Sequence, residues 1–391
     1  LGRHETGLAL LHRALAVDPD SALGQYRLAL AYDRLGRPAD AIPHYEAAVA
    51  ASPGHNPTIN RLAEAYQRVG RLADARKAYE KSLANNPGYE VDAILGLAAL
   101  DIQEGSTRSY LLAKRRLTDL LAWMPENVAA RVNLGVVRSA LGQQQPAMRE
   151  YRLALDQEPS NVTALLNLGQ LEHAAGREDR AAELFRRALD AGLQSPEQAV
   201  VVHDFLLTRS KISQAVDVWR RVVDTFPDSM MARGFLAWSH ALNGQPTQAK
   251  EVIAELSNEP GDGFAERPIV VAALAYLSFV ESRYEPATRR IATLCRQRDA
   301  AAKDARQRLL GAFERFDTDH PNRPWTYCLT ARLLIAEGRL KAAGVFVGLC
   351  KQWCPPSAPC QGELQTLRSQ MERGDAPGGA SGHRSKSDAV R

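Results

Sequence analysis

A period of 34 residues, marked by proline, constrains the fold of this chain more than any other feature of its sequence. Pro19, Pro53 and Pro87 stand one period apart, and each closes a segment of similar composition. Apolar residues recur at i, i+1 and i+4 in the first half of a segment, and small and aromatic residues at i, i+4 and i+7 in the second half. Each half therefore has the apolar face of a helix, and the period predicts a stack of two-helix units.

Glycine and proline mark where these helices are expected to end. Gly36 and Gly70 separate the two halves, where the chain needs a left-handed backbone or a close approach of two helices. Proline closes the second helix because it has no N–H to donate to a further turn. One complete unit contains Leu62-Ala63, Tyr66, Gly70, Ala75, Tyr79, Ser82 and Pro87, and the unit before it contains Leu28-Ala29, Tyr32, Gly36, Ala41, Tyr45, Ala48 and Pro53.

These residues resemble the consensus of the tetratricopeptide repeat family. The resemblance covers most of residues 1–355 and fades toward the C-terminus. It implies an all-α fold, a right-handed superhelical solenoid of about nine to ten helix-turn-helix repeats, some of them degenerate. Arginine far outnumbers lysine and alanine is abundant, which favours a bacterial source with a GC-rich genome.

Five segments are expected along the chain. Residues 1–193 are predicted to be a regular array with a truncated first unit; residues 2–19 match only a second helix, so a first helix is expected upstream and the chain is expected to be a fragment. Degenerate repeats follow at 194–295, where Ser210 replaces the turn glycine. A charged helical linker is expected at 296–323 as a continuation of the helix before it, a last repeat with a capping helix at 324–373, and a disordered tail at 374–391. In the fourth repeat, three extra residues are expected to lengthen the turn around Thr107 to Tyr110.

The sequence contains no motif of a catalytic or cofactor-binding site. There is no G-x-S-x-G nucleophile motif, no phosphate loop and no H-E-x-x-H zinc motif, so we expect no enzyme, no metal and no cofactor in these residues. The net charge of +4 over 391 residues is too small to indicate nucleic-acid binding. No apolar run is long enough for a membrane span, and the compartment, cytoplasmic or periplasmic, stays open.

All the cysteines lie in the last quarter of the chain: Cys295, Cys328, Cys350, Cys354 and Cys360. We expect unpaired structural thiols, because Cys350 falls where the repeat needs a small buried residue. A disulfide such as Cys354 to Cys360 remains open, since a bend between the two allows their approach. A metal site also remains open, although no CxxC pair is present.

The family resemblance implies a concave surface lined by the first helices of the repeats. The registers that face this surface hold Arg27, Arg34, Arg61, Arg68, Asn133 and Asn167. Each pair of arginines is separated by two helical turns and shares one helix face, so four guanidiniums are expected in one patch. Such a patch suits carboxylates, which arginine binds bidentately, and the two asparagines could hold the backbone of a bound peptide. The alternative is a polar wall that contacts only solvent.

The sequence therefore predicts a protein–protein interaction scaffold that recruits a segment of a partner protein, of acidic character, in its concave groove. One alternative is an accessory repeat domain of a larger, upstream-fused enzyme of the glycosyltransferase, sulfatase, kinase or multihaem type. Another is a self-associating spacer, which exposed apolar residues on the degenerate repeats would favour.

Overall fold

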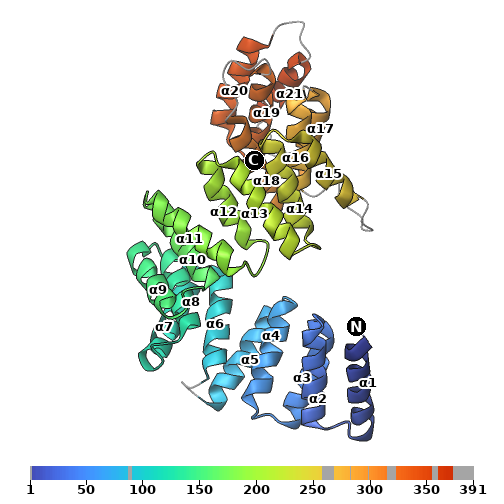
Figure 1. Cartoon of the computed structure of the whole chain (residues 1–391), viewed down its shortest axis with the longest axis vertical. Helices are drawn as coiled ribbons and strands as arrows, with labels where there is room; N and C mark the ends of the chain where they lie inside the picture. Colours follow the sequence, from blue (N-terminus) through green and yellow to red (C-terminus); the bar gives the residue numbers. More distant parts are fainter. Residues whose placement is uncertain are drawn as a thin grey trace, which may run out of the picture. The chain divides into compact units, whose positions relative to one another are not determined.

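The computed structural model describes residues 2–86, 90–257, 268–281, 283–297, 299–314, 323–354 and 360–372, and every regular element in these ranges is an α-helix (Figure 1). The prediction of an all-α helical repeat solenoid is confirmed. The helices form two compact units, Leu1–Gly192 and Leu193–Arg391. The tail predicted at 374–391 lies outside the described residues.

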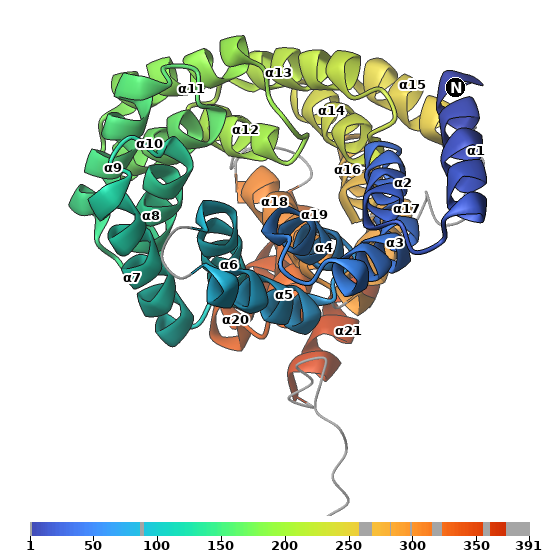
Figure 2. The same ribbon diagram turned by 90° about the horizontal axis from the view of Figure 1, so that it is seen from below.

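The N-terminal unit is a stack of antiparallel helix pairs, preceded by the single helix α1 (Gly2–Val17). Each pair holds the first and the second helix of one repeat: α2 (Ala22–Arg34) with α3 (Pro38–Ala51), α4 (Asn56–Arg68) with α5 (Leu72–Asn85), α6 (Val91–Glu104) with α7 (Thr107–Trp123), α8 (Val128–Ala140) with α9 (Gln144–Gln157), and α10 (Val162–Ala174) with α11 (Glu178–Ala191). Figure 2 shows the first helices α8 and α10 on the inner side of this layer and the second helices α9 and α11 on its outer side.

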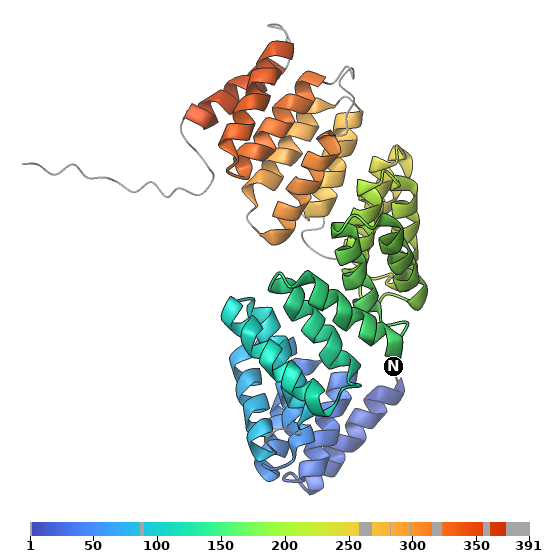
Figure 3. The same cartoon turned by 90° about the vertical axis from the view of Figure 1, so that its left-hand side faces the viewer.

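The C-terminal unit continues the pairing less regularly. Its helices are α12 (Gln198–Thr208), α13 (Ile212–Thr225), α14 (Met230–Leu242), α15 (Pro246–Ser257), α16 (Pro268–Val280), α17 (Tyr284–Arg296), α18 (Ala300–Glu314), α19 (Arg323–Ala336), α20 (Leu340–Trp353) and α21 (Cys360–Glu372). The last of them, orange to red in Figure 3, lie side by side. None of the helices in the described ranges combines the length and the apolarity that a membrane crossing requires.

The turn inside most of the repeats closes with the same backbone hydrogen bond. In the third repeat Gly70 adopts a φ of 79°, and the N–H of Arg71 donates to the carbonyl oxygen of Tyr66 at 2.8 Å. This bond satisfies a carbonyl group that the helix end would otherwise leave without a partner. Ser210 adopts the same left-handed backbone, with a φ of 55°, as the only non-glycine residue with positive φ in the described part of the chain.

Small residues on the first helix bring it close to an aromatic ring on the second helix. A Cβ atom added at Gly135 would lie 2.5 Å from the ring of Tyr151, and one at Gly169 would lie 2.7 Å from the ring of Phe185. Both rings are almost completely buried. Glycine is therefore required at these two positions because the ring occupies the space of a side chain.

Three consecutive repeats carry a charged residue where the consensus has the aromatic residue of the first helix. These residues are Asp101, Arg138 and Glu172, each four residues after the consensus leucine of its helix. Asp101 is 1% exposed and accepts hydrogen bonds from Arg76 of α5, at 2.7 Å, and from Arg116 of α7. A buried carboxylate is tolerated only when it is paired in this way.

Glu172 and Arg138 also form ion pairs with side chains of neighbouring helices. Glu172, on α10, accepts hydrogen bonds from Arg152 of α9 at 2.7 Å and from Arg177 at the start of α11. Arg138 donates to Glu150 of α9 at 2.6 Å. At these three positions of the N-terminal unit, ion pairs with neighbouring helices thus take the place of the consensus aromatic residue of the first helix.

Two expectations about helix boundaries were wrong. The extra residues of the fourth repeat do not lengthen its turn: Ser106 caps α7 by accepting from the N–H of Ser109 at 3.0 Å, so the insertion extends the helix, which begins at Thr107. The segment predicted at 296–323 does not continue α17, because the backbone of Gln297 is extended. A separate helix, α18, follows, and its apolar side chains, such as Leu309 and Phe313, are buried.

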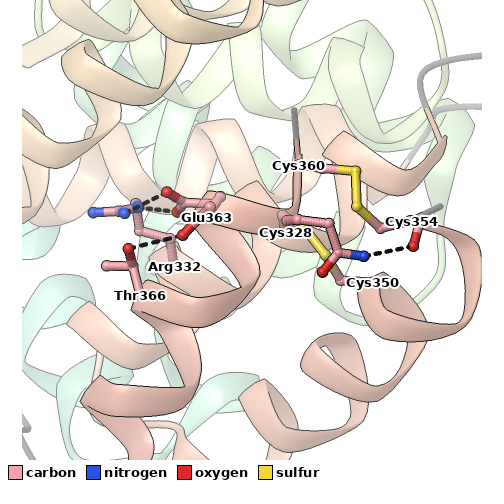
Figure 4. The surroundings of a disulfide bond; sticks show 9 residues. Cys328, Arg332, Cys350, Cys354, Cys360, Glu363 and Thr366 are labelled. Atoms are coloured by element: carbon pink, nitrogen blue, oxygen red, sulfur yellow. Dashed lines mark hydrogen bonds and ion pairs between the residues drawn. A yellow bond between two sulfur atoms is a disulfide. The ribbon is translucent and has the colours of Figure 1, made fainter. Parts of the chain in front are cut away.

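The expectation of unpaired cysteines was wrong for four of the five. Cys328 on α19 and Cys350 on α20 form a disulfide across the helix pair, with Cα atoms 5.4 Å apart, and Cys354 pairs with Cys360 at 6.1 Å (Figure 4). The register of Cys350 does bury a small side chain, but the same register faces α19, where the second sulfur lies. Only Cys295 is a free thiol.

Candidate partner-binding surface

Arg27 and Arg34 lie on α2 and line a cleft of about 390 Å³ between α1 and α2. The other lining residues are apolar, among them Leu8 and Leu11 of α1 and Leu30 of α2. Both arginine side chains are exposed, and neither forms a hydrogen bond or an ion pair with any residue of the described ranges. The cleft therefore combines an apolar floor with two uncompensated positive charges.

The second pair of arginines, on α4, has carboxylate partners within the protein. Arg61 donates to Glu64 at 2.8 Å, and this carboxylate raises the pKa of the Arg61 guanidinium. Arg68 donates to Asp33 of α2 at 2.5 Å. Asp33 also accepts a hydrogen bond from the hydroxyl group of Tyr45 at 2.7 Å, so that one carboxylate connects α2, α3 and α4. A partner carboxylate at Arg61 or Arg68 would have to compete with these groups.

Asn133 on α8 and Asn167 on α10 are half-buried, at the same register of two neighbouring first helices. In the part of the chain that the structure describes, no hydrogen bond engages either side-chain amide. Each amide therefore keeps a donor and an acceptor for a peptide group.

The sequence could not foresee the pairing of Asp33 with Arg68, since it joins residues 35 positions apart. The one available signal was that both positions lie next to the turns of adjacent repeats.

In the C-terminal unit the corresponding registers are occupied by the chain itself. Phe235 of α14 has the register of Arg27, and Asp204 of α12 has that of Leu30. Arg308 of α18 donates to both oxygens of Asp204, one of them at 3.3 Å, and its guanidinium lies 4.8 Å from the centre of the Phe235 ring. Arg308 of α18 thus contacts two first-helix positions whose counterparts in the N-terminal unit line the cleft beside α1.

The described residues contain no group of three or more His, Cys, Asp or Glu side chains that could hold a metal ion. The described helices form a repeated surface, and parts of the sequence match models of a known protein family. Models described as tetratricopeptide repeat match residues 1–56 and 139–196, residues 34–99 and residues 230–255. The chain is a tetratricopeptide repeat protein. Proteins of this kind are interaction scaffolds, and the repeats point to a non-catalytic role.

Solved structures of other tetratricopeptide repeat proteins resemble parts of this one. PilF of Pseudomonas aeruginosa is 17% identical, covers 56% of this chain and 98% of its own, and has a TM-score of 0.44. TTC0263 of Thermus thermophilus is 21% identical, covers 48% of this chain and 100% of its own, with a TM-score of 0.42. MamA of Desulfovibrio magneticus is 19% identical, covers 44% of this chain and 94% of its own, and has a TM-score of 0.39. No curated protein matches the sequence.

Proposed function

We propose that this tetratricopeptide repeat protein is a scaffold that recruits an acidic segment of a partner protein to the first helices of its N-terminal unit. The observation that carries the proposal is the state of Arg27 and Arg34. Both are exposed, both line the cleft beside α1, and neither has a carboxylate partner in the described ranges. Arginine binds a carboxylate through two parallel hydrogen bonds, and such charge-assisted bonds are stronger than neutral ones.

Arg61 and Arg68 extend this basic surface to the next repeat, and Asn133 and Asn167 extend the binding path further along the unit. Arg61 and Arg68 contribute positive charge that Glu64 and Asp33 only partly offset, since three of these four side chains are well exposed. The asparagine amides would hold the backbone of the bound segment and add little sequence selectivity. Binding energy spread over several repeats means that single substitutions should weaken binding without abolishing it.

The test is a selection of binding peptides from a display library with three forms of the full chain. These are the wild type, the double variant Arg27→Glu/Arg34→Glu, and a control with the same charge change on the second helices, Arg115→Glu/Arg149→Glu. We expect the wild type and the control to enrich the same peptides, rich in Asp and Glu, and the first variant to bind them at least about tenfold more weakly. Enriched peptides without acidic residues, or equal binding to all three forms, would refute the proposal.

A further inference from the structure

We infer that a cleft at the junction of the fourth, fifth and sixth repeats binds an arginine side chain on the surface of a partner protein. The guanidinium would stack on the indole ring of Trp123 and donate hydrogen bonds to the carboxylates of Glu126 and Glu158. This site shares no residue with the first-helix surface of the proposed function, and it selects a cation where that surface selects an acid.

The cleft has a volume of about 610 Å³ and lies between the loop that joins α7 to α8 and the end of α9. Trp123, Met124 and Pro125 form its apolar side together with the first residues of α8. Glu126 and Glu158 add two carboxylates, and none of the described residues that line the cleft is basic. An aromatic and apolar surface beside two carboxylates suits a cation with an apolar stem, as in arginine.

The repeat itself does not require a tryptophan at this position. The residues at the register of Trp123 in the neighbouring repeats are small or polar: Ala51, Asn85, Gln157 and Ala191. Trp123 and Met124 are 42% and 36% exposed, so neither side chain belongs to the buried core that joins the helices. Large aromatic side chains that the fold leaves exposed are typical of contact sites for other molecules.

The two carboxylates of the cleft lack a cationic partner within the described residues. Both are exposed, and Glu126 forms no hydrogen bond or ion pair there. The carboxylate of Glu158 accepts one hydrogen bond, from the uncharged side-chain amide of Asn161 at 3.0 Å. Both therefore keep oxygen atoms for a guanidinium, whose planar N–H groups bind carboxylates while its face stacks on an aromatic ring. Lysine offers a single charged point and no such face, so the site favours arginine.

Hydrogen bonds within the chain fix the loop that carries the indole ring and the first carboxylate. Asn127 caps α8 by accepting from the N–H of Ala130 at 2.8 Å. Arg131 donates to the carbonyl oxygen of Pro125 at 2.9 Å and pairs with Glu150, so its charge is already compensated. A loop that is ordered before binding loses little conformational freedom when a partner docks.

Nuclear magnetic resonance of the full chain, labelled with ¹⁵N at tryptophan, tests this site directly. The probe is arginine with a blocked α-amino and a blocked α-carboxyl group, which has only the charge of a partner's side chain. The indole N–H resonance of Trp123, assigned by its absence in Trp123→Asn, should shift saturably with a dissociation constant of about one millimolar. Blocked citrulline, a neutral compound of the same shape, should bind at least about tenfold more weakly. The resonances of Trp219 and Trp238, which are almost completely buried, should not shift.

Two double variants separate the cleft from the general charge of the surface. Glu126→Gln/Glu158→Gln should weaken the binding of blocked arginine about tenfold and change the binding of citrulline much less. The matched control Asp119→Asn/Asp156→Asn removes two exposed carboxylates from α7 and α9 and should leave binding unchanged. Circular dichroism melts verify that every variant is folded.

The absence of a saturable shift at Trp123, equal binding of arginine and citrulline, or equal loss in both double variants would overturn the inference. Free arginine gains no contact in this site from its α-groups, so it should bind about as tightly as the blocked form. Much tighter binding of free arginine would assign the cleft to a small molecule and also overturn the inference. A dimer that Trp123→Asn dissociates would have the same consequence, because it would assign the cleft to a second copy of this chain.

Discussion

At the residue scale, Ser210 tests how far backbone geometry alone determines the repeat turn. Ser210 adopts a φ of 55° where most of the other repeat turns have glycine, and the N–H of Lys211 still donates to the carbonyl oxygen of Leu206 at 2.9 Å. A left-handed backbone costs a residue with a Cβ atom about 1–2 kcal/mol, and the greater freedom of glycine in the unfolded chain cancels part of this. Ser210→Gly should therefore raise the free energy of unfolding by about 0.5–1 kcal/mol, measured by urea denaturation.

The reverse change provides the control for this prediction. Gly70 has a φ of 79° in the same turn of the third repeat. Gly70→Ser should lower the free energy of unfolding by a similar amount, because it introduces the strain that Ser210→Gly removes. If Ser210→Gly were neutral while Gly70→Ser destabilised the protein, the strain at Ser210 would be compensated by local contacts, and the prediction would be wrong.

For the candidate surface, the sequence predicted which helices carry the arginines, but not which of these arginines pair with a carboxylate. Register alone placed Arg27, Arg34, Arg61 and Arg68 on the first helices, since a period of one repeat fixes which residues share a face. It could not separate the two arginines without partners from the two that pair with Glu64 and Asp33. Pairing depends on side-chain reach between neighbouring helices, which the one-dimensional period does not contain.

At the scale of helices, Glu172 holds three elements together, because it accepts from α9 and from the start of α11. Burial by itself raises the pKa of Glu172, but the hydrogen bonds from Arg177 and Arg152 outweigh burial and hold this pKa below its ordinary value of 4.5. A carboxyl whose pKa is lowered by folding stabilises the protein above pH 4.5, and this contribution disappears as the pH falls through its folded pKa. Glu172→Gln should therefore lower the free energy of unfolding at pH 7 by about 2 kcal/mol.

The pH dependence distinguishes this charge effect from a packing effect. The difference in urea midpoint between the wild type and Glu172→Gln should shrink as the pH falls below 4.5, where Glu172 itself becomes neutral. Glu183→Gln is the control, because Glu183 pairs with Arg186 on an exposed face of α11 and its loss should leave the midpoint unchanged. A constant difference at all pH values would show that the amide disturbs packing and not charge.

The existence of the helices followed from the sequence more closely than their boundaries and contacts did. The 34-residue period and its glycines predicted the pairs α2/α3 and α4/α5 because every local signal agreed with the repeat. The longer α7 was missed, since an insertion at a turn and an insertion in a helix look alike until the cap at Ser106 is seen. Helix α18 was taken for a charged linker because its apolar side chains are interspersed with Arg, Asp and Lys. Its contacts with α12 and α14 are too distant in sequence for any pattern to reveal.

At the scale of the whole molecule, covalent cross-links distinguish the two units. Every cysteine lies in the C-terminal unit, and two disulfides join α19 to α20 and α20 to α21. They lie next to the ion pair of Arg332 with Glu363, in which Nη2 donates to Oε2 at 2.6 Å (Figure 4). The N-terminal unit depends instead on packing and on ion pairs between helices. Reduction should consequently act on one unit and spare the other.

Hydrogen exchange measured peptide by peptide can detect this difference. A disulfide that closes a loop of about 20 residues stabilises the folded state by about 3 kcal/mol, largely by restricting the unfolded chain. Reduction should therefore speed amide exchange in α19, α20 and α21, and leave the exchange of α2 to α11 unchanged. Cys328→Ser/Cys350→Ser should reproduce most of the effect without reductant.

Burial raises the pKa of the Cys295 thiol to about 11, so alkylation of the folded, oxidised protein at neutral pH should modify none of its cysteines. After unfolding without reductant only Cys295 should react. Labelling of more than one cysteine at that stage, or faster exchange in the N-terminal unit on reduction, would contradict the assignment of the cross-links.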